Sequence, residues 1–148
     1  MSSTHLSLHY HIIFSTKERR ELIADEWRAR LHAFIGGSIK MLDGVPEAIG
    51  GTRDHIHVLI GLRATHRLAE VVKEIKVASS KWIHEELNHK LFGWQNGYGA
   101  FTVSVSQIGN VKNYVLNQEI HHQKKSFQEE YLAILKQANV DYDERYLW

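Results

Sequence analysis

Two histidines separated by one residue, His55 and His57, are the first candidates for chemistry in this chain. They lie in residues 55–62, an apolar and β-branched run after a glycine-rich turn that indicates a strand. Side chains alternate along a strand, so both imidazoles point to the same face and could share one metal ion. Because burying two imidazoles without a role would cost desolvation energy, the pair predicts a metal site.

A second group of candidate residues lies on a predicted helix, where Tyr114 and Gln118 fall one turn apart on the same face. A free phenol has a pKa of about 10, so tyrosine needs a metal-polarised phosphate or a base to act as a nucleophile. The amide oxygen of Gln118 suits hard divalent ions and could be a third ligand. Together the two groups suggest phosphoryl transfer with Tyr114 as nucleophile, although Tyr114 could also be a packing aromatic.

Several further polar residues have an open role at this stage. His9 and His11 form another same-face pair, on the N-terminal strand, and compete for the metal role. His121 and His122 follow Gln118 and either approach the site or only end the helix. Asp54 precedes the strand histidines, where it either orients a ligand or serves as a turn residue.

Length and composition limit the class of protein. The 148 residues, 43% hydrophobic and 24% charged, predict one globular domain spanning residues 1–148. The chain has no cysteine, which excludes disulfides, thiolate metal sites and cysteine nucleophiles and is compatible with a cytoplasmic protein. We expect no membrane association, because no signal-peptide pattern and no apolar run of about 18 residues is present.

The net charge of +1 does not by itself indicate a nucleic-acid-binding protein, so any phosphate contacts would depend on local basic clusters. These clusters could equally be solvated faces. The candidate DNA-binding residues are Lys17, Arg19 and Arg20 after the first strand, Lys73, Lys76 and Lys81 along a helix, and Lys112, which with Lys124 and Lys125 flanks the Tyr114 segment.

Hydrophobic periodicity predicts the elements that must position these residues. Strands are expected at 5–14, 45–51, 55–62 and 100–105, and a loop at 88–99. Helices are expected from Asp25, as a cap, to about Leu42, from Thr65 through Ile83, around Tyr114 with Ser106 or Asn110 as cap, and from the Ser126–Glu129 capping box through Lys136. The order β-α-β-β-α-β predicts an α+β fold, a ferredoxin-like split β-α-β antiparallel sheet with helices on one face, plus C-terminal helices that carry the nucleophile.

The combination of these segments resembles a known family. His55-Ile56-His57 is similar to the histidine motif of HUH endonucleases, and Tyr114 followed by Gln118 resembles the single-tyrosine transposases of small bacterial insertion sequences. Residues 10–17, 54–59, 114–124 and 142–148 are also similar to segments of this group, so the resemblance covers nearly the whole chain.

The resemblance implies a complete mechanism. A Mg²⁺ or Mn²⁺ ion held by His55, His57 and Gln118 would polarise the scissile phosphate of single-stranded DNA that carries hairpins at the element ends. Tyr114 would attack and form a 5′-phosphotyrosine with release of a 3′-OH, and another 3′-OH would then rejoin the DNA. It also implies a homodimer, in which the Tyr helix of one subunit can complete the histidine site of the other.

Two other functions are compatible with the same residues. A ferredoxin-like sheet with basic edges could bind single-stranded nucleic acid without catalysis, with Tyr114 and the histidines used only in packing. A small phosphohydrolase could instead use His55, His57 and a further ligand to activate water. Only the transposase would form a covalent bond between Tyr114 and DNA.

Overall fold

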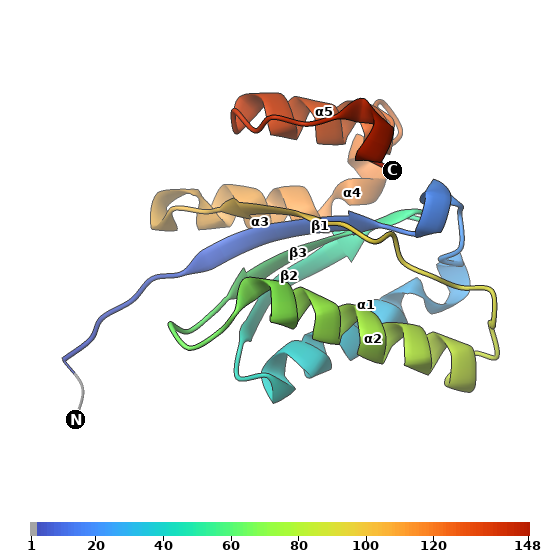
Figure 1. Cartoon of the computed structure of the whole chain (residues 1–148), viewed down its shortest axis with the longest axis horizontal. Coiled ribbons are helices and arrows are strands. Elements are labelled where there is room, and N and C mark those ends of the chain that lie inside the picture. The colour runs from blue at the N-terminus through green and yellow to red at the C-terminus, as the bar shows by residue number, and fades with distance from the viewer. Residues whose placement is uncertain (1–2) are drawn as a thin grey trace.

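In residues 3–148, which the computed structural model describes, four short strands build a single antiparallel sheet, and helices cover both of its faces (Figure 1). The strands are β1 (His9–Ser15), β2 (Val45–Gly51), β3 (His55–Gly61) and β4 (Gly99–Thr102), in the spatial order β2-β3-β1-β4. The helices are α1 (Asp25–Met41), α2 (Leu68–Glu86), α3 (Ile108–Leu116), α4 (Gln118–His121) and α5 (Phe127–Gln137). This order confirms the predicted ferredoxin-like α+β fold.

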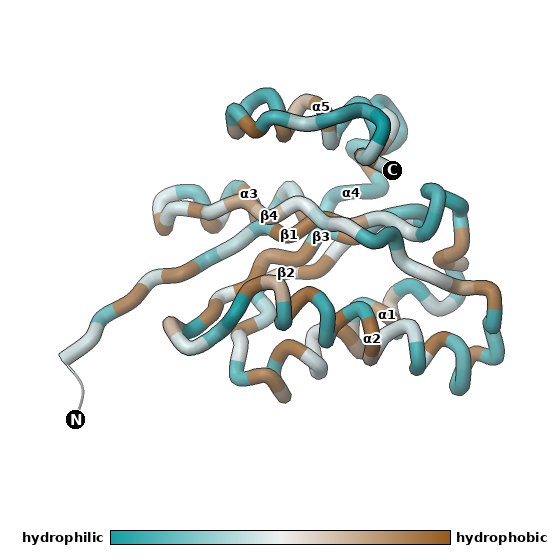
Figure 2. Tube along the Cα trace, viewed as in Figure 1, coloured by the Kyte–Doolittle hydropathy of each residue, from teal (hydrophilic) through white to brown (hydrophobic). Residues whose placement is uncertain are grey.

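The alternation of side chains along β3 divides the molecule into two layers. Ile56, Val58 and Ile60 are fully buried in the main core, where they meet the inner sides of α1 and α2. Figure 2 shows the hydrophobic residues concentrated in the strands and along the helix sides that face them. Among residues 3–148, no helix has both the length and the apolar composition needed to cross a bilayer.

The opposite face of β3 carries His55, His57 and Leu59, and it is covered by α3, α4 and α5 (Figure 1). Leu59 packs with Ala48 of β2 and Val115 of α3 in a second, smaller core. This small apolar cluster holds α3 on the sheet, next to the two histidines. The C-terminal helices therefore lie over the candidate site.

The strand ends differ from the predictions by a few residues. β1 begins at His9 rather than His5, because His9 pairs with Gly61, the last residue of β3. β4 ends at Thr102, before a 3-10 turn at Val105–Gln107 that leads into α3. The expected strand at 100–105 was therefore too long at its C-terminal end.

The helix caps were predicted with mixed success. The Ser126 capping box is confirmed, since the Ser126 hydroxyl accepts a hydrogen bond from the Glu129 amide at 3.2 Å. Asp25 is the first residue of α1 and not its cap, which is Ala24. The predicted caps of the Tyr114 helix are wrong, because α3 follows directly from the preceding 3-10 turn and needs no side-chain cap. α2 begins at Leu68, three residues later than predicted.

Candidate metal and nucleophile site

Strand β3 places both predicted ligands at the centre of the sheet, where the side chains of His55 and His57 are fully buried. Their ring centroids lie 5.1 Å apart. The Nδ1 atom of His55 lies 2.8 Å from Asp54 Oδ1 and 3.1 Å from Thr52 Oγ1, so its Nε2 atom points towards α4 and α5. Asp54 thus contacts the imidazole of a candidate metal ligand and also the turn residue Thr52, so its position fits both of its predicted roles.

The second imidazole is held between two other polar groups. His57 Nδ1 lies 2.7 Å from His11 Nε2, and His57 Nε2 lies 3.0 Å from Glu130 Oε1. Burial lowers the pKa of His57 to about 4, although its hydrogen bond with Glu130 opposes the shift. His57 is therefore neutral near pH 7, which is the form of imidazole that binds metals.

The predicted third ligand reaches the same site across a break in the helix. We expected one helix through Tyr114 and Gln118, but it is interrupted at Asn117, where φ is −107° and ψ is 29°. Gln118 nevertheless stays close to Tyr114, as the one-turn spacing predicts, because its Nε2 atom donates a hydrogen bond to the Tyr114 carbonyl oxygen at 3.2 Å. Gln118 Oε1 lies 3.0 Å from His55 Nε2 and 3.1 Å from His122 Nε2.

Two residues that the sequence did not assign to the site, Glu130 and His122, lie within it. The sequence left open whether His122 approaches the site or only ends the helix, and it gave no role to Glu130. The ligand atoms of His55, His122 and Glu130 lie within 4.8 Å of one another. Glu130 could have been found from the pattern of α5, because it lies between the inward residues Phe127 and Leu135 and is 3% exposed.

The candidate nucleophile lies beside these ligands within the same chain. The Tyr114 ring is half-buried, with its centroid 5.8 Å from that of His57, and its hydroxyl donates a hydrogen bond to Glu130 Oε2. Burial and the Glu130 carboxylate raise the pKa of Tyr114 above its usual value. The phenol is therefore protonated at neutral pH.

The other histidines have supporting or separate positions. His11 contacts His57 and lies against the Tyr114 ring, with centroids 6.2 Å apart. The ring of His121 stands 4.6 Å from that of Tyr114. His9 instead contacts Glu47 on the neighbouring part of the sheet. The two histidines of the N-terminal strand therefore contact different partners, and His11 lies next to the candidate site.

A groove gives access to Tyr114 from solvent. It has a volume of about 780 Å³ and runs between α3 and α5, lined among others by Tyr114, His121, Lys124, Lys125 and Glu130. The two lysines follow α4 and are exposed. A phosphate in this groove could therefore meet two cationic side chains as well as the phenol.

The predicted DNA-binding residues do not form one surface. Lys17, Arg19 and Arg20 lie at a turn after β1, where Arg20 pairs with Glu18 and Arg19 lies over the Trp148 ring. Lys112 is exposed on α3.

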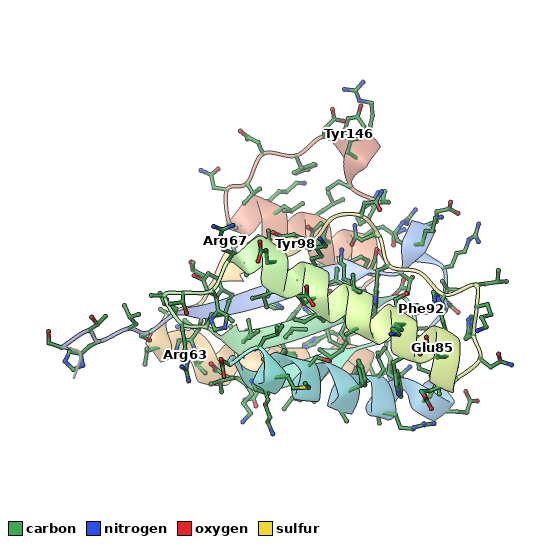
Figure 3. All side chains as sticks on the ribbon, turned by 60° about the horizontal axis from the view of Figure 1, so that its bottom comes forward. Arg63, Arg67, Glu85, Phe92, Tyr98 and Tyr146 are labelled. Atoms are coloured by element: carbon green, nitrogen blue, oxygen red, sulfur yellow. The ribbon has the colours of Figure 1, made fainter. Side chains whose placement is uncertain are left out.

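The lysines of α2 lie on the far side of the sheet from Tyr114. Figure 3, which turns this side forward, shows Tyr98 beside α2. Lys73 and Lys81 are exposed there, whereas Lys76 donates to the carbonyl oxygens of Gln95 and Gly97 at 2.9 and 2.7 Å. Lys76 is therefore partly engaged by the protein itself.

Comparisons with known proteins point to one family. The family model described as "Transposase IS200 like" matches residues 4–118. The ISDra2 transposase TnpA of Deinococcus radiodurans is 24% identical over 124 residues, which cover 75% of this chain and 84% of that protein.

Two solved structures share the fold. A candidate transposase from Deinococcus radiodurans has a TM-score of 0.64 at 23% identity, over 80% of this chain and 95% of its own. A REP-associated tyrosine transposase bound to a REP hairpin has a TM-score of 0.60 at 14% identity, over 82% of this chain and 74% of its own.

Proposed function

This chain belongs to the family of IS200-like transposases, and we propose that it cleaves and rejoins single-stranded DNA through a tyrosine nucleophile. The product of the first step would be a 5′-phosphotyrosine on Tyr114. The substrate would be DNA with hairpins at the element ends. The observation that carries this proposal is the position of the Tyr114 hydroxyl, which bonds to Glu130 beside a buried group of candidate metal ligands, while Tyr114 also lines a groove.

The donor atoms at this site fit a divalent metal. Imidazole nitrogens of His55 and His57 and the amide oxygen of Gln118 form a mixed nitrogen and oxygen set, which suits Mn²⁺ and can hold Mg²⁺. When bound, such an ion would act as a Lewis acid on the scissile phosphate. Asp54 contacts the Nδ1 atom of His55, and His11 contacts the Nδ1 atom of His57. These contacts would hold the two ligand imidazoles in place.

The chemistry requires one covalent exchange and its reversal. The Tyr114 oxygen would form a bond to phosphorus while the bond from phosphorus to the 3′-oxygen breaks. The phenol loses its proton, and the departing 3′-oxygen gains one. A 3′-OH of another strand would then attack phosphorus and release Tyr114, so the energy of the phosphodiester is conserved and no nucleotide cofactor is needed.

The form of the DNA follows from access to the phenol. Tyr114 is half-buried and lines a groove bordered by α3 and α5, and a single strand could bring its phosphate to this position more readily than a duplex. Lys124 and Lys125 line the same groove and would contact the phosphate backbone of the DNA. One structural neighbour is bound to a hairpin, which supports a hairpin substrate for this chain as well.

Dimer formation remains part of the proposal. In this structure Tyr114, His55 and Gln118 meet within one chain. Each subunit of a dimer would therefore hold a complete site, whereas the resemblance also allows exchange of the Tyr helix between subunits.

The proposal is tested on a denaturing gel with labelled single-stranded DNA that carries the ends of the element. We expect a protein-linked DNA band in the presence of Mn²⁺, and its loss with EDTA or in Tyr114→Phe. DNA binding without an adduct would favour a non-catalytic binding protein. Cleavage without an adduct would indicate activated water and contradict the tyrosine mechanism.

A further inference from the structure

The carboxylate of Glu130 connects two parts of the site that the sequence treats as separate. Its Oε1 atom lies 3.0 Å from His57 Nε2, 3.2 Å from His122 Nε2 and 3.8 Å from His55 Nε2. Its Oε2 atom accepts the hydrogen bond of the Tyr114 hydroxyl. One oxygen thus faces the metal-ligand imidazoles and the other faces the nucleophile.

We propose that Glu130 and His122 are metal ligands, and that the Glu130 carboxylate bridges the bound ion and the nucleophile. This inference rests on the proposed function, and it adds two residues of the C-terminal segment to the predicted ligands. Both residues lie beyond the segment matched by the family model, which ends at Gln118. The C-terminal segment would therefore contribute metal ligands to the site.

The spacing of the donor atoms supports this assignment. In an octahedral site with bonds of about 2.1 Å, neighbouring ligand atoms are about 3 Å apart. The distances from Glu130 Oε1 to His57 and His122 have this length. The same holds for Gln118 Oε1, which lies 3.0 Å from His55 Nε2 and 3.1 Å from His122 Nε2.

Charge gives a second reason. Neutral imidazoles and an amide bring no negative charge to a buried divalent ion, so a carboxylate would balance part of its charge. Glu130 brings such a carboxylate within 3.0 Å of His57 Nε2 and 3.2 Å of His122 Nε2.

The start of α5 fixes the direction of this side chain. The Ser126 capping box begins the helix, and Phe127 in its first turn stacks on His55 with a centroid distance of 4.3 Å and an interplanar angle of 17°. Glu130 follows three residues later on the same face. It is the charged member of an otherwise apolar inner stripe of α5, which points to a specific role.

The bridge would also position the nucleophile. Because Oε2 accepts from the Tyr114 hydroxyl, the phenolic oxygen is held next to the ligand group rather than free to turn into the groove. Correct placement of reacting groups contributes a large part of the rate of such exchanges. Loss of Glu130 should therefore lower both metal affinity and adduct formation.

Isothermal titration with Mn²⁺ tests the ligand assignment without reference to activity. We expect Glu130→Gln and His122→Ala each to weaken Mn²⁺ binding by about tenfold or more, since changes even to the groups that orient ligands have such effects. The neighbouring exposed residue provides a matched control, because Glu129→Gln preserves the capping box and should bind as the wild type does.

Two results would overturn the inference. One is a Glu130→Gln protein with wild-type Mn²⁺ affinity and adduct yield. The other is tighter Mn²⁺ binding by Glu130→Ala, because Glu130 would then compete with the ion for the imidazoles. If the variants fail to fold, the ¹³C chemical shift of the Glu130 carboxyl in wild-type protein labelled with ¹³C-glutamate is followed while the diamagnetic ion Mg²⁺ is added. A changed shift supports ligation, and an unchanged shift at saturating Mg²⁺ contradicts it.

The outcome separates this inference from the proposed function. A wild-type protein that binds Mn²⁺ through Glu130 but never forms an adduct would overturn the transposase mechanism and leave the ligand assignment intact. If the wild type forms the DNA adduct and the Glu130 and His122 variants form it equally well, the transposase mechanism is supported and the ligand assignment is contradicted.

Discussion

The carbonyl oxygen of Val115 in α3 lies so close to Gly50 of β2 that a Cβ atom at position 50 would be 1.8 Å from it. Val115 directly follows the candidate nucleophile, Tyr114. The missing side chain of Gly50 therefore sets how closely the Tyr helix approaches the sheet, and with it the distance between the phenol and the histidines of β3. The obstacle is backbone, which cannot turn aside as a flexible side chain can.

Gly50→Ala is expected to displace α3 and to destabilise the protein by about 1–3 kcal/mol, the usual cost of overpacking. Urea denaturation measures the stability, and the adduct assay should show a marked loss of yield. Gly37→Ala in α1 is the matched control, because nothing lies within 4 Å of its added Cβ. That control should be more stable by about 0.5–1 kcal/mol. Wild-type stability and adduct yield in Gly50→Ala would contradict this account.

Asp54→Asn should weaken Mn²⁺ binding by about 10–100-fold, because an amide holds His55 Nδ1 less firmly than a carboxylate does. Asp54 accepts from both Thr52 and His55, and an asparagine can keep the turn contact. Isothermal titration measures the affinity, with Asp141→Asn in the exposed tail as control. Equal affinities for Asp54→Asn and wild type would show that Asp54 is only a turn residue.

Mixed oligomers should be inactive if each chain holds a complete site. Tyr114→Phe and His57→Ala are co-expressed with different tags and purified through both tags in turn. Because Tyr114 meets His57 within one chain, neither subunit of such a hetero-oligomer has both functional groups. We expect no DNA adduct on the denaturing gel. A restored adduct would show that the Tyr helix is exchanged between subunits, as the family resemblance also allows.

His32 should make the folded state less stable in mild acid. Burial, together with the nearby Arg28 charge, lowers the pKa of His32 from 6.5 to about 4, so the unfolded chain binds a proton that the folded protein does not. Stability is then lost as the pH falls from about 6.5 to about 4, by up to about 1 kcal/mol per pH unit. Urea denaturation of the wild type and of His32→Leu across this range should give a smaller pH slope for the variant. Equal pH slopes of stability for the two proteins would contradict a lowered pKa of His32 in the folded state.

The sequence was sufficient to predict the sheet and the positions of His55 and His57 on one of its faces, because these signals are local. Alternation along β3 placed His55 and His57 on one face, and the observed pairing of β3 with β1 and β2 confirms that the strand is central. The capping box of α5 could be predicted for the same reason, since it depends on two residues three positions apart.

Contacts between segments that are far apart in the sequence could not be predicted from such local patterns. The break at Asn117 turns the chain so that His122 and α5 return over the sheet, and this turn brings Glu130 to His57, 73 positions earlier. Periodicity shows which face of a helix is buried but not which residues it will meet. The sequence therefore indicated only that Glu130 is a charged residue in an apolar stripe, and not that it would contact His57.

The most direct test of the central claim is peptide mapping by mass spectrometry after incubation with Mn²⁺ and single-stranded DNA carrying the element ends. The covalent complex is digested with nuclease and protease, and the residual nucleotide is located on the chain. We expect the added nucleotide mass on the peptide that contains Tyr114, and on no other tyrosine peptide. An adduct on Tyr131 or another tyrosine, or strand cleavage with no modified peptide, would contradict the assignment of Tyr114 as the nucleophile.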